Sequence, residues 1–208
     1  MNYQSFSQFC LSFALALMTP LAFADDFVCN WAHGPIVIDG NDDEKAWSNA
    51  TVIDGFRIPD STSPVPQTAT RARLLWDRQF LYFFAELEDH DLFADITEHD
   101  GQTWSNDVFE IFLKPSRVAD GYYEFQVNAA GTEMDMFLPD QKSGGFNALK
   151  ANNDFHWKTQ VRRKGTLNER EDRDQSWSVE GRIPWLDFMP TGGRPGLDEV
   201  WQMALCRY

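Results

Sequence analysis

The amino-acid sequence predicts an all-β protein, an antiparallel β-sandwich of jelly-roll-like form with at most short helical turns. Three observations lead to this fold class. Several segments alternate apolar and polar residues with a period of two, turn signals separate them, and no long amphipathic helical pattern occurs among the 208 residues. Short strands separated by turns in this way are typical of sandwiches.

The clearest strand pair surrounds a turn at Asp77-Arg78-Gln79. Residues 72–77 (ARLLWD) and 80–89 (FLYFFAELED) flank this turn as the two arms of a hairpin do. In the second arm, apolar side chains occupy both faces of the strand. This predicts an inner strand of the sandwich, covered on both sides.

The other elements are shorter. Residues 35–40 (PIVIDG) are expected to form a strand, and residues 42–47 (DDEKAW) and 184–188 (PWLDF) a helical turn each. Residues 61–70 are a Pro- and Ser-rich loop, and residues 165–175 (GTLNEREDRDQ) a solvated hairpin tip. Further strands are expected at residues 107–115, 122–131, 133–139, 155–163, 176–184 and 200–208.

The N-terminal 24 residues have the features of a secretory signal peptide. Phe9 to Met18 form an apolar run that is too short for a bilayer span of roughly 20 residues. Ala22-Phe23-Ala24 then gives a small-x-small cleavage pattern before Asp25. We therefore expect a secreted or periplasmic mature chain, residues 25–208, that forms a single domain without a membrane span.

Charge and cysteines narrow the class further. The formal net charge of −14 argues against a nucleic-acid partner, because phosphate binding needs clustered Lys and Arg. Cys10 would be removed with the signal peptide, which leaves Cys29 and Cys206 at the two ends of the mature chain. In an oxidising compartment they are expected to form a disulfide, and two separate buried thiols are the alternative.

No catalytic pattern is present in the sequence. Asp107 and Glu110 are three residues apart in a segment patterned as a strand, so their side chains point to opposite faces and do not flank one bond as glycosidase carboxylates must. GxSxG, HExxH and phosphate-loop motifs do not occur. We therefore expect a binding module rather than an enzyme.

Metal ligands are a further possibility in two oxygen-rich runs. Residues 39–44 and 86–100 carry several carboxylates, and calcium takes roughly six to eight oxygen ligands in proteins. The alternative is a plain acidic surface. The four histidines are scattered and are either metal ligands or solvated turn positions: His33, His90, His99 and His156.

Trp104 is the strongest candidate for ligand contact. It follows HDGQT and precedes SND, which places an indole ring on a loop at the mouth of a strand. There the ring could be a flat platform for the C–H groups of a sugar, or it could cap the edge of the core. If residues 107–115 and 122–131 pair antiparallel, Glu110 would meet Gln126 and Asn128 beside it. An aromatic floor with polar hydrogen-bonding side chains is the composition of a small polar-ligand site.

Five blocks occur in an order that resembles carbohydrate-binding module family 9 and its relatives. They are IDGNDDEKAW (38–47), ARLLWDRQFLYFFAELEDHD (72–91), WSNDVFEIFLKP (104–115), YYEFQVNAAG (122–131) and WSVEGRIPW (177–185). The resemblance covers about residues 34–208. It implies a β-sandwich that holds a saccharide between two Trp rings, with carboxylate, amide and basic side chains around the ligand, and it implies structural calcium.

Carried over by motif, the resemblance assigns ligand-contact roles to individual residues. Trp104 matches the first stacking Trp, Glu110 the motif glutamate three residues after Asp107, and Asn128 the asparagine of the VN step. Gln126 stands where better-known members carry an arginine.

A second stacking Trp has no clear counterpart. In the family it lies near the C-terminus, whereas Trp157 precedes the WSVEGRIPW block. Relatives continue beyond the position of Tyr208, so the chain is expected to lack a C-terminal segment.

Three functions are compatible with these observations. The first is a non-catalytic secreted domain that binds a mono- or oligosaccharide, either free-standing or within a larger polysaccharide-degrading protein. The second is an electron-transfer module that holds haem b, because some relatives of this sandwich use His and Met ligands, and Met134 and Met136 lie in a predicted strand. The absence of CxxCH excludes covalent haem. The third is a scaffold or sensor domain without sugar binding.

Overall fold

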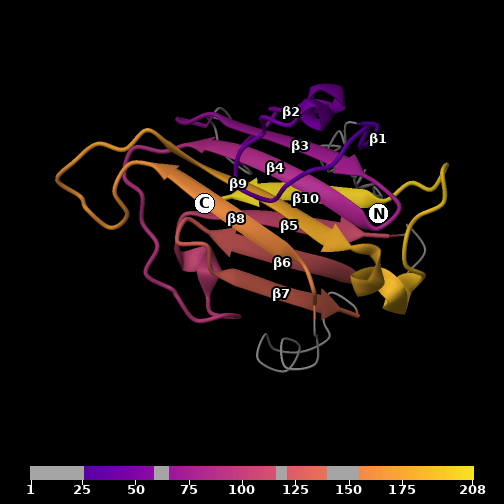
Figure 1. The fold of residues 1–208 in the computed structure, drawn as a ribbon. Helices are drawn as coiled ribbons and strands as arrows, with labels where there is room; N and C mark the ends of the chain where they lie inside the picture. The colour runs from indigo at the N-terminus through magenta and orange to yellow at the C-terminus, as the bar shows by residue number, and fades with distance from the viewer. Residues whose placement is uncertain (1–25, 59–65, 116–120, 140–154) are drawn as a thin grey trace, which may run out of the picture.

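The computed structural model describes residues 26–58, 66–115, 121–139 and 155–208. Two β-sheets pack face to face in this part of the chain, which confirms the predicted antiparallel sandwich (Figure 1). The predicted signal peptide and the first half of the Pro- and Ser-rich loop, residues 61–65, lie outside the described residues. Among the described helices, none has the length and apolarity that a membrane crossing requires.

The first sheet, called sheet A, is centred on the predicted hairpin. β3 (Thr70–Trp76) and β4 (Phe80–Glu88) pair antiparallel, and β9 (Ser176–Pro184) and β8 (Lys158–Lys164) continue the sheet beyond β4. β4 is therefore an inner strand, as predicted. Two short strands complete the other edge of the sheet: β1 (Asn30–Trp31) and β2 (Val52–Ile53), which both pair with β3.

The second sheet, called sheet B, contains four antiparallel strands. The strand order is β10 (Gln202–Arg207), β5 (Val108–Lys114), β6 (Tyr122–Asn128) and β7 (Glu133–Leu138). Three short 3-10 turns lie outside the sheets: η1 (Lys45–Asn49), η2 (Thr103–Ser105) and η3 (Trp185–Thr191). The first and third are the helical turns expected from the sequence.

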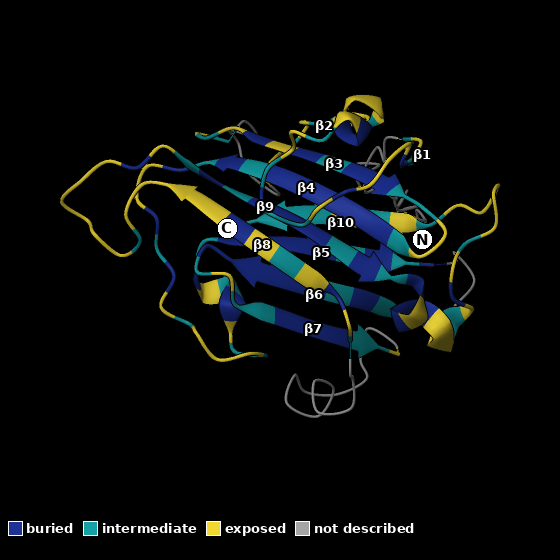
Figure 2. Ribbon diagram, in the orientation of Figure 1, coloured by how far each residue is buried: buried dark blue, intermediate teal, exposed yellow. Residues whose placement is uncertain are grey.

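The main core fills the space between the sheets and is rich in aromatic rings. Phe125 of β6 lies 5.1 Å from Trp157 between ring centroids, and Phe83 of β4 lies 6.3 Å from Phe109 of β5. Trp157 is therefore a core residue, which excludes it as a second stacking ring. Figure 2 shows the central strands of both sheets largely buried, whereas the edge strand β8 is mostly exposed.

A smaller apolar cluster covers the outer face of sheet A. Tyr82 and Phe84 of β4 and Leu75 of β3 pack there against Ile36 and Trp47 from the N-terminal segment. This segment is the cover that the two-sided apolar pattern of β4 requires.

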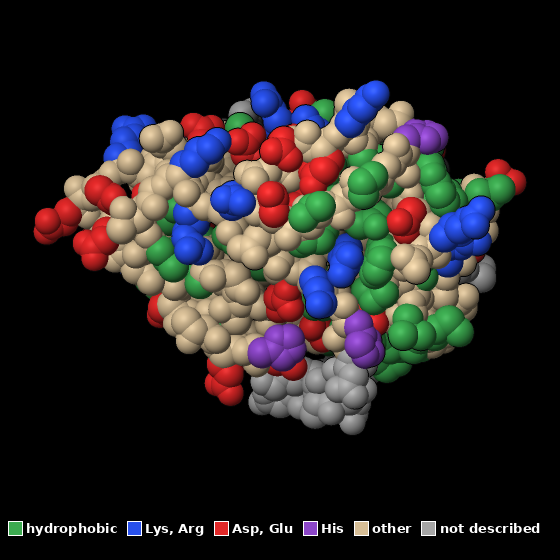
Figure 3. Space-filling view, in the orientation of Figure 1, with side chains coloured by type: hydrophobic (Ala, Val, Ile, Leu, Met, Phe, Trp, Pro, Cys, Tyr) green, Lys and Arg blue, Asp and Glu red, His purple; other side chains and the backbone are tan. Residues whose placement is uncertain are grey.

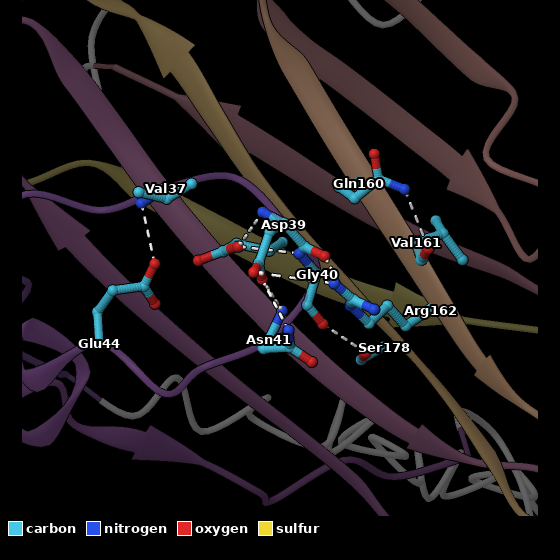
Figure 4. A network of polar contacts seen from close by, with 10 residues as sticks. Val37, Asp39, Gly40, Asn41, Glu44, Gln160, Val161, Arg162 and Ser178 are labelled. Carbon is cyan, nitrogen blue, oxygen red and sulfur yellow. Dashed lines mark hydrogen bonds and ion pairs between the residues drawn. The ribbon is translucent and has the colours of Figure 1, made fainter.

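Residues 35–40 do not form the strand that the sequence predicts. Their backbone is held by side chains instead, because the Glu180 carboxylate of β9 accepts hydrogen bonds from the N–H groups of Asp39 and Gly40 at 2.8 and 3.0 Å. Gly40 has a φ of 87°, a conformation that favours glycine. Figure 4 shows this network, in which Ser178 and Arg162 also bond to the segment.

Glu180 also holds η1 against sheet A. Its second oxygen accepts a hydrogen bond from the indole N–H of Trp47 in η1 at 3.1 Å. Burial raises the pKa of Glu180 to about 7, against the hydrogen bonds from the backbone and from Trp47, which lower it. One buried carboxylate thus fastens the cover segment to sheet A.

The predicted disulfide is not formed, and both cysteines are free thiols. Cys29 packs against the core between the sheets. Cys206 lies opposite Glu110 in the β10–β5 pair, and the Glu110 and Glu124 carboxylates add to the effect of burial in raising its pKa. Strand alternation therefore places the Cys206 thiol on the outer face of sheet B, with the sheet between the two sulfur atoms.

Replacing Glu180 with alanine is expected to lower the free energy of unfolding by at least about 2 kcal/mol, because three buried donors lose their acceptor. Urea unfolding at pH 5.5 would measure this. The control is Glu86→Ala on the neighbouring strand, an exposed carboxylate whose loss is expected to cost less than about 0.5 kcal/mol. Equal effects of the two substitutions would contradict the role given to Glu180.

Candidate functional site

The outer face of sheet B carries a row of polar side chains at its centre. Glu110 of β5 lies directly opposite Gln126 of β6, which confirms the antiparallel pairing expected from the sequence. Cys206 of β10 and Met134 of β7 complete the row across the four strands. Because Glu110 and Gln126 are almost fully buried, this row is not an ordinary solvated sheet face.

Glu110 is the unusual member of the row. It is 3% exposed, and the described residues give its carboxylate no hydrogen bond. Burial raises its pKa to about 7, and the nearby Glu124 carboxylate contributes to the same increase. A buried carboxylate without donors is costly in a folded protein, so Glu110 is a strong candidate for contact with a ligand that supplies them.

Gln126 joins the site to the turn that carries Trp104. Its Oε1 atom accepts a hydrogen bond of 2.6 Å from the Thr103 hydroxyl, and its Nε2 atom donates one of 2.6 Å to Glu124. These bonds leave Gln126 one donor and one acceptor position. Its amide therefore retains capacity for a ligand.

Trp104 lies at the centre of η2, directly before β5 as the sequence predicts. The turn packs against β5 and β6, and the ring is half-buried. Backbone bonds from Ser105 to Gln102 and from Asn106 to Thr103 close the turn. The geometry places Trp104 beside the polar row.

Asn128 has a different position from the one expected. Its side chain donates to the Ile96 carbonyl and to Asn106, and accepts from the backbone N–H groups of Ala130 and Thr132. These four bonds use the whole capacity of an amide, and the residue is fully buried. Asn128 therefore anchors the loop before η2, and no atom of its side chain is left for a ligand.

The carboxylates Asp107 and Glu110 lie in separate environments, as their spacing predicts. Asp107 accepts a hydrogen bond from the Phe93 N–H at 2.6 Å, and the charges near it belong to Asp89, Asp91 and Arg207. The charged neighbour of Glu110 is Glu124. The two carboxylates therefore do not form a catalytic pair.

Three residues of the site were missed from the sequence. Thr103 orients Gln126 by a hydrogen bond, and no sequence pattern predicts this contact. Glu124 lies two residues before Gln126 on the same strand, so both side chains point to the same face of the sheet. The alternation of β6 could therefore have identified Glu124 from the sequence. Tyr208 is 67% exposed and follows β10, where its N–H donates to the carbonyl of Val108, two residues before Glu110, at 3.3 Å.

The positions of the His and Met side chains do not support the haem-binding hypothesis. All four histidines are exposed, whereas Met134 and Met136 are buried on the outer face of sheet B. Three of the histidines approach carboxylates instead: His90, His99 and His156. No buried His–Met pair occurs among the described residues.

A cavity of about 350 Å³ opens at one end of the sandwich. Apolar side chains of both sheets line it, among them Leu74, Leu113 and Met203, together with Trp76 and Trp201. Figure 3 shows hydrophobic side chains gathered on the side of the molecule where the C-terminal segment after η3 lies in Figure 1. The lining also contains Trp185 and the acidic residues Asp198 and Glu199.

The sequence profile of the carbohydrate family 9 binding domain-like family matches residues 38–203, and the chain belongs to this family. Part of the chain is also 33% identical, over 101 residues, to endo-1,4-beta-xylanase A of Thermotoga maritima. This alignment covers 46% of the chain but only 9% of the enzyme. The similarity therefore concerns a small part of that protein.

Solved structures show the same sandwich. A family 9 carbohydrate-binding module from Caldicellulosiruptor kristjanssonii, in complex with cellotriose, has a TM-score of 0.52 at 20% identity, covering 85% of this chain and 74% of that chain. A module from the same organism in complex with glucose has the same score and identity, with 85% and 75% covered. A candidate carbohydrate-binding protein from Bacteroides uniformis has a TM-score of 0.57 at 15% identity, with 77% and 72% covered.

The calcium that the family resemblance implies does not fit the group of potential metal ligands found in the described residues. That group consists of His99, Asp100 and Asp135, and an imidazole is not a donor that calcium prefers. In the run 39–44, Asp39 and Glu44 accept hydrogen bonds from Asn41 and Val37 instead.

The burial of Glu110 predicts a pH dependence of stability. Its pKa is about 7 in the folded protein against an ordinary 4.5, so the folded protein holds the proton more tightly between these values. The stabilisation by this group is complete below about pH 4.5 and is lost as the pH rises through 7. Glu110→Gln is expected to remove on the order of 2 kcal/mol of this loss.

Urea unfolding of the wild type and of Glu110→Gln at pH 4.5, 6 and 8 would test this. The exposed Glu98→Gln serves as a control and should keep the full pH dependence. An unchanged slope in Glu110→Gln would show that the carboxylate is not desolvated in solution.

Proposed function

We propose that this protein is a non-catalytic saccharide-binding domain whose site lies on the outer face of sheet B. Trp104 is the stacking platform, and Glu110 and Gln126 are the hydrogen-bonding groups. Membership of the family and the sugar complexes of the Caldicellulosiruptor modules support a carbohydrate ligand. The arrangement of Trp104, Glu110 and Gln126 supports this location.

The observation that carries the proposal is the unpartnered carboxylate of Glu110. Sugar hydroxyls are donors, and a hydrogen bond to an ionised carboxylate is roughly twice as strong as a neutral one. The ligand therefore supplies what the described residues do not give to Glu110. The remaining positions on Gln126 then accept from and donate to a neighbouring hydroxyl.

The ring of Trp104 contributes the apolar part of the site. The C–H groups of a pyranose carry partial positive charge and pack on the negative face of an indole. The small number of groups in the site suggests affinities in the micromolar to millimolar range. Tyr208 is bonded through its N–H to Val108 of β5 and would add a second aromatic wall.

We further propose that the mature chain is exported, free-standing or as part of a larger polysaccharide-degrading protein. The apolar N-terminus with its Ala-Phe-Ala motif supports export. The similarity of one segment to part of a xylanase supports an association with polysaccharide breakdown.

Replacing Trp104 with alanine is expected to weaken saccharide binding by at least about 2 kcal/mol, or roughly thirtyfold, because the stacking face is lost. Binding to glucose and cello-oligosaccharides is measured by titration calorimetry and affinity gels. Trp201→Ala is the control, since Trp201 is also half-buried but lines the apolar cavity. Unchanged affinity in Trp104→Ala with unchanged melting would refute this role of the ring.

Glu110→Gln is expected to weaken binding by about 1.5–3 kcal/mol, because an amide replaces the ionised acceptor. The same substitution should raise stability at pH 8, so loss of binding cannot be attributed to unfolding. In the wild type, affinity should rise between pH 5.5 and 8.5 as Glu110 ionises, whereas the variant should show a flat profile. A flat wild-type profile would exclude Glu110 as the charged acceptor.

A further inference from the structure

Three potential metal-ligating side chains meet beside the edge strand β7. His99 and Asp100 come from the loop before η2, and Asp135 comes from β7. The His99 Nε2 atom lies 3.7 Å from Asp100 Oδ1 and 3.9 Å from Asp135 Oδ2. These separations are close to those between neighbouring ligands of one small divalent ion, given metal–ligand distances of about 2.0–2.2 Å.

The framework around these side chains is fixed by hydrogen bonds. The Asp100 N–H donates to the Glu133 carbonyl at 3.0 Å, which fastens the loop to β7. The indole N–H of Trp157 donates to Asp135 Oδ2 at 2.8 Å. Donors of this kind orient the ligands in metal sites.

One side chain of the group is buried and another is exposed, a combination that would hold an ion firmly and still let it enter. The Asp135 side chain is 3% exposed, whereas that of His99 is 61% exposed and offers an entry path. Figure 3 shows histidines of the molecule at the surface beside acidic side chains. The Asp100 carboxylate is a second acidic group whose oxygen lies within 4.8 Å of the Asp135 carboxylate. The local charge therefore favours a cation.

The donor chemistry distinguishes between cations. Calcium and magnesium prefer oxygen ligands, whereas zinc and its first-row neighbours bind one imidazole and two carboxylates readily. We propose that His99, Asp100 and Asp135 form a binding site for a divalent transition-metal ion of the zinc type. Water would complete the coordination, as in sites with three protein ligands.

The site would have a structural consequence for the neighbouring loop. Trp104 follows Asp100 after only three residues, so a bound ion would fix the start of the turn that carries the ring. The proposal does not depend on saccharide binding, because the ligands belong to a separate set of residues.

Titration of the tag-free, metal-free protein with Zn²⁺ against a chromophoric chelator tests the proposal. One ion is expected to bind per chain, with micromolar or tighter affinity, and millimolar Ca²⁺ should not displace it. Co²⁺ substitution should give visible absorption bands typical of nitrogen and oxygen ligands. His99→Ala and Asp135→Asn are each expected to weaken binding at least tenfold.

His156→Ala is the matched control. His156 is also exposed and lies 3.0 Å from the buried Asp187, but the described part of the chain offers no third ligand to that pair. This variant should bind Zn²⁺ as the wild type does. Because His99 is exposed, His99→Ala should keep the fold even if Asp135→Asn does not.

Three results would overturn the proposal. Absence of saturable Zn²⁺ binding would show that His99 only forms ion pairs with the two aspartates. Equal loss of binding in His156→Ala would indicate nonspecific uptake by surface histidines. Displacement of the bound Zn²⁺ by Ca²⁺ would show that the ion is held by oxygen ligands at a site other than His99, Asp100 and Asp135.

Discussion

The register of β5 against β6 is the constraint on which the rest of the site depends. It sets Glu110 opposite Gln126 on the outer face, while Phe109 and Ile111 of β5 face the aromatic core with Val127 and Phe125. A shift of one residue would move the carboxylate into the core and the rings out of it. The burial of the aromatic face therefore fixes the position of the polar row.

The loop before η2 depends on the same strand pair. Asn128 ends β6 and uses all of its hydrogen-bonding capacity to hold Ile96, Asn106 and the turn after β6. Thr103 then donates to Gln126 two positions earlier on the same strand. The position of Trp104 is thus set by two amides of β6, one of which has no capacity left for a ligand.

Sequence periodicity was sufficient to predict much of this architecture. Alternation in residues 80–89 predicts an inner strand because two covers bury its two faces, and both covers are present in the core and the N-terminal segment. Alternation in β5 and β6 likewise predicts the pairing of Glu110 with Gln126. Each of these predictions rests on local backbone geometry combined with burial.

The incorrect predictions from the sequence concern residues whose structure is set by a partner far away in the chain rather than by local periodicity. PIVIDG has the composition of a strand, yet its backbone donors are taken by Glu180, which is 140 residues away in the sequence from Gly40. The terminal position of Cys29 and Cys206 suggested a disulfide, but the parity of β10 turns Cys206 away from the core. Asn128 looked like a ligand group because its partners lie in a loop that periodicity does not describe.

Glu110 and Glu180 are similar buried side chains that differ in their hydrogen-bond partners. Both are glutamates on inner strands, both are buried, and burial raises the pKa of each to about 7. Glu180 accepts three hydrogen bonds from donors that the chain itself provides. Glu110 receives none from the described residues.

The desolvation of the Glu180 carboxylate is therefore offset within the fold, whereas the described residues do not offset that of Glu110. This difference could not be read from the strands themselves, because EGRIP and EIFLK both present a glutamate within an apolar run. It depends on what covers each face. The N-terminal segment brings backbone and indole N–H groups to sheet A, whereas η2, the turn that contains Trp104, packs against β5 and β6 of sheet B. The described residues on that side give Glu110 no hydrogen bond, and the proposed contact with a saccharide rests on this difference.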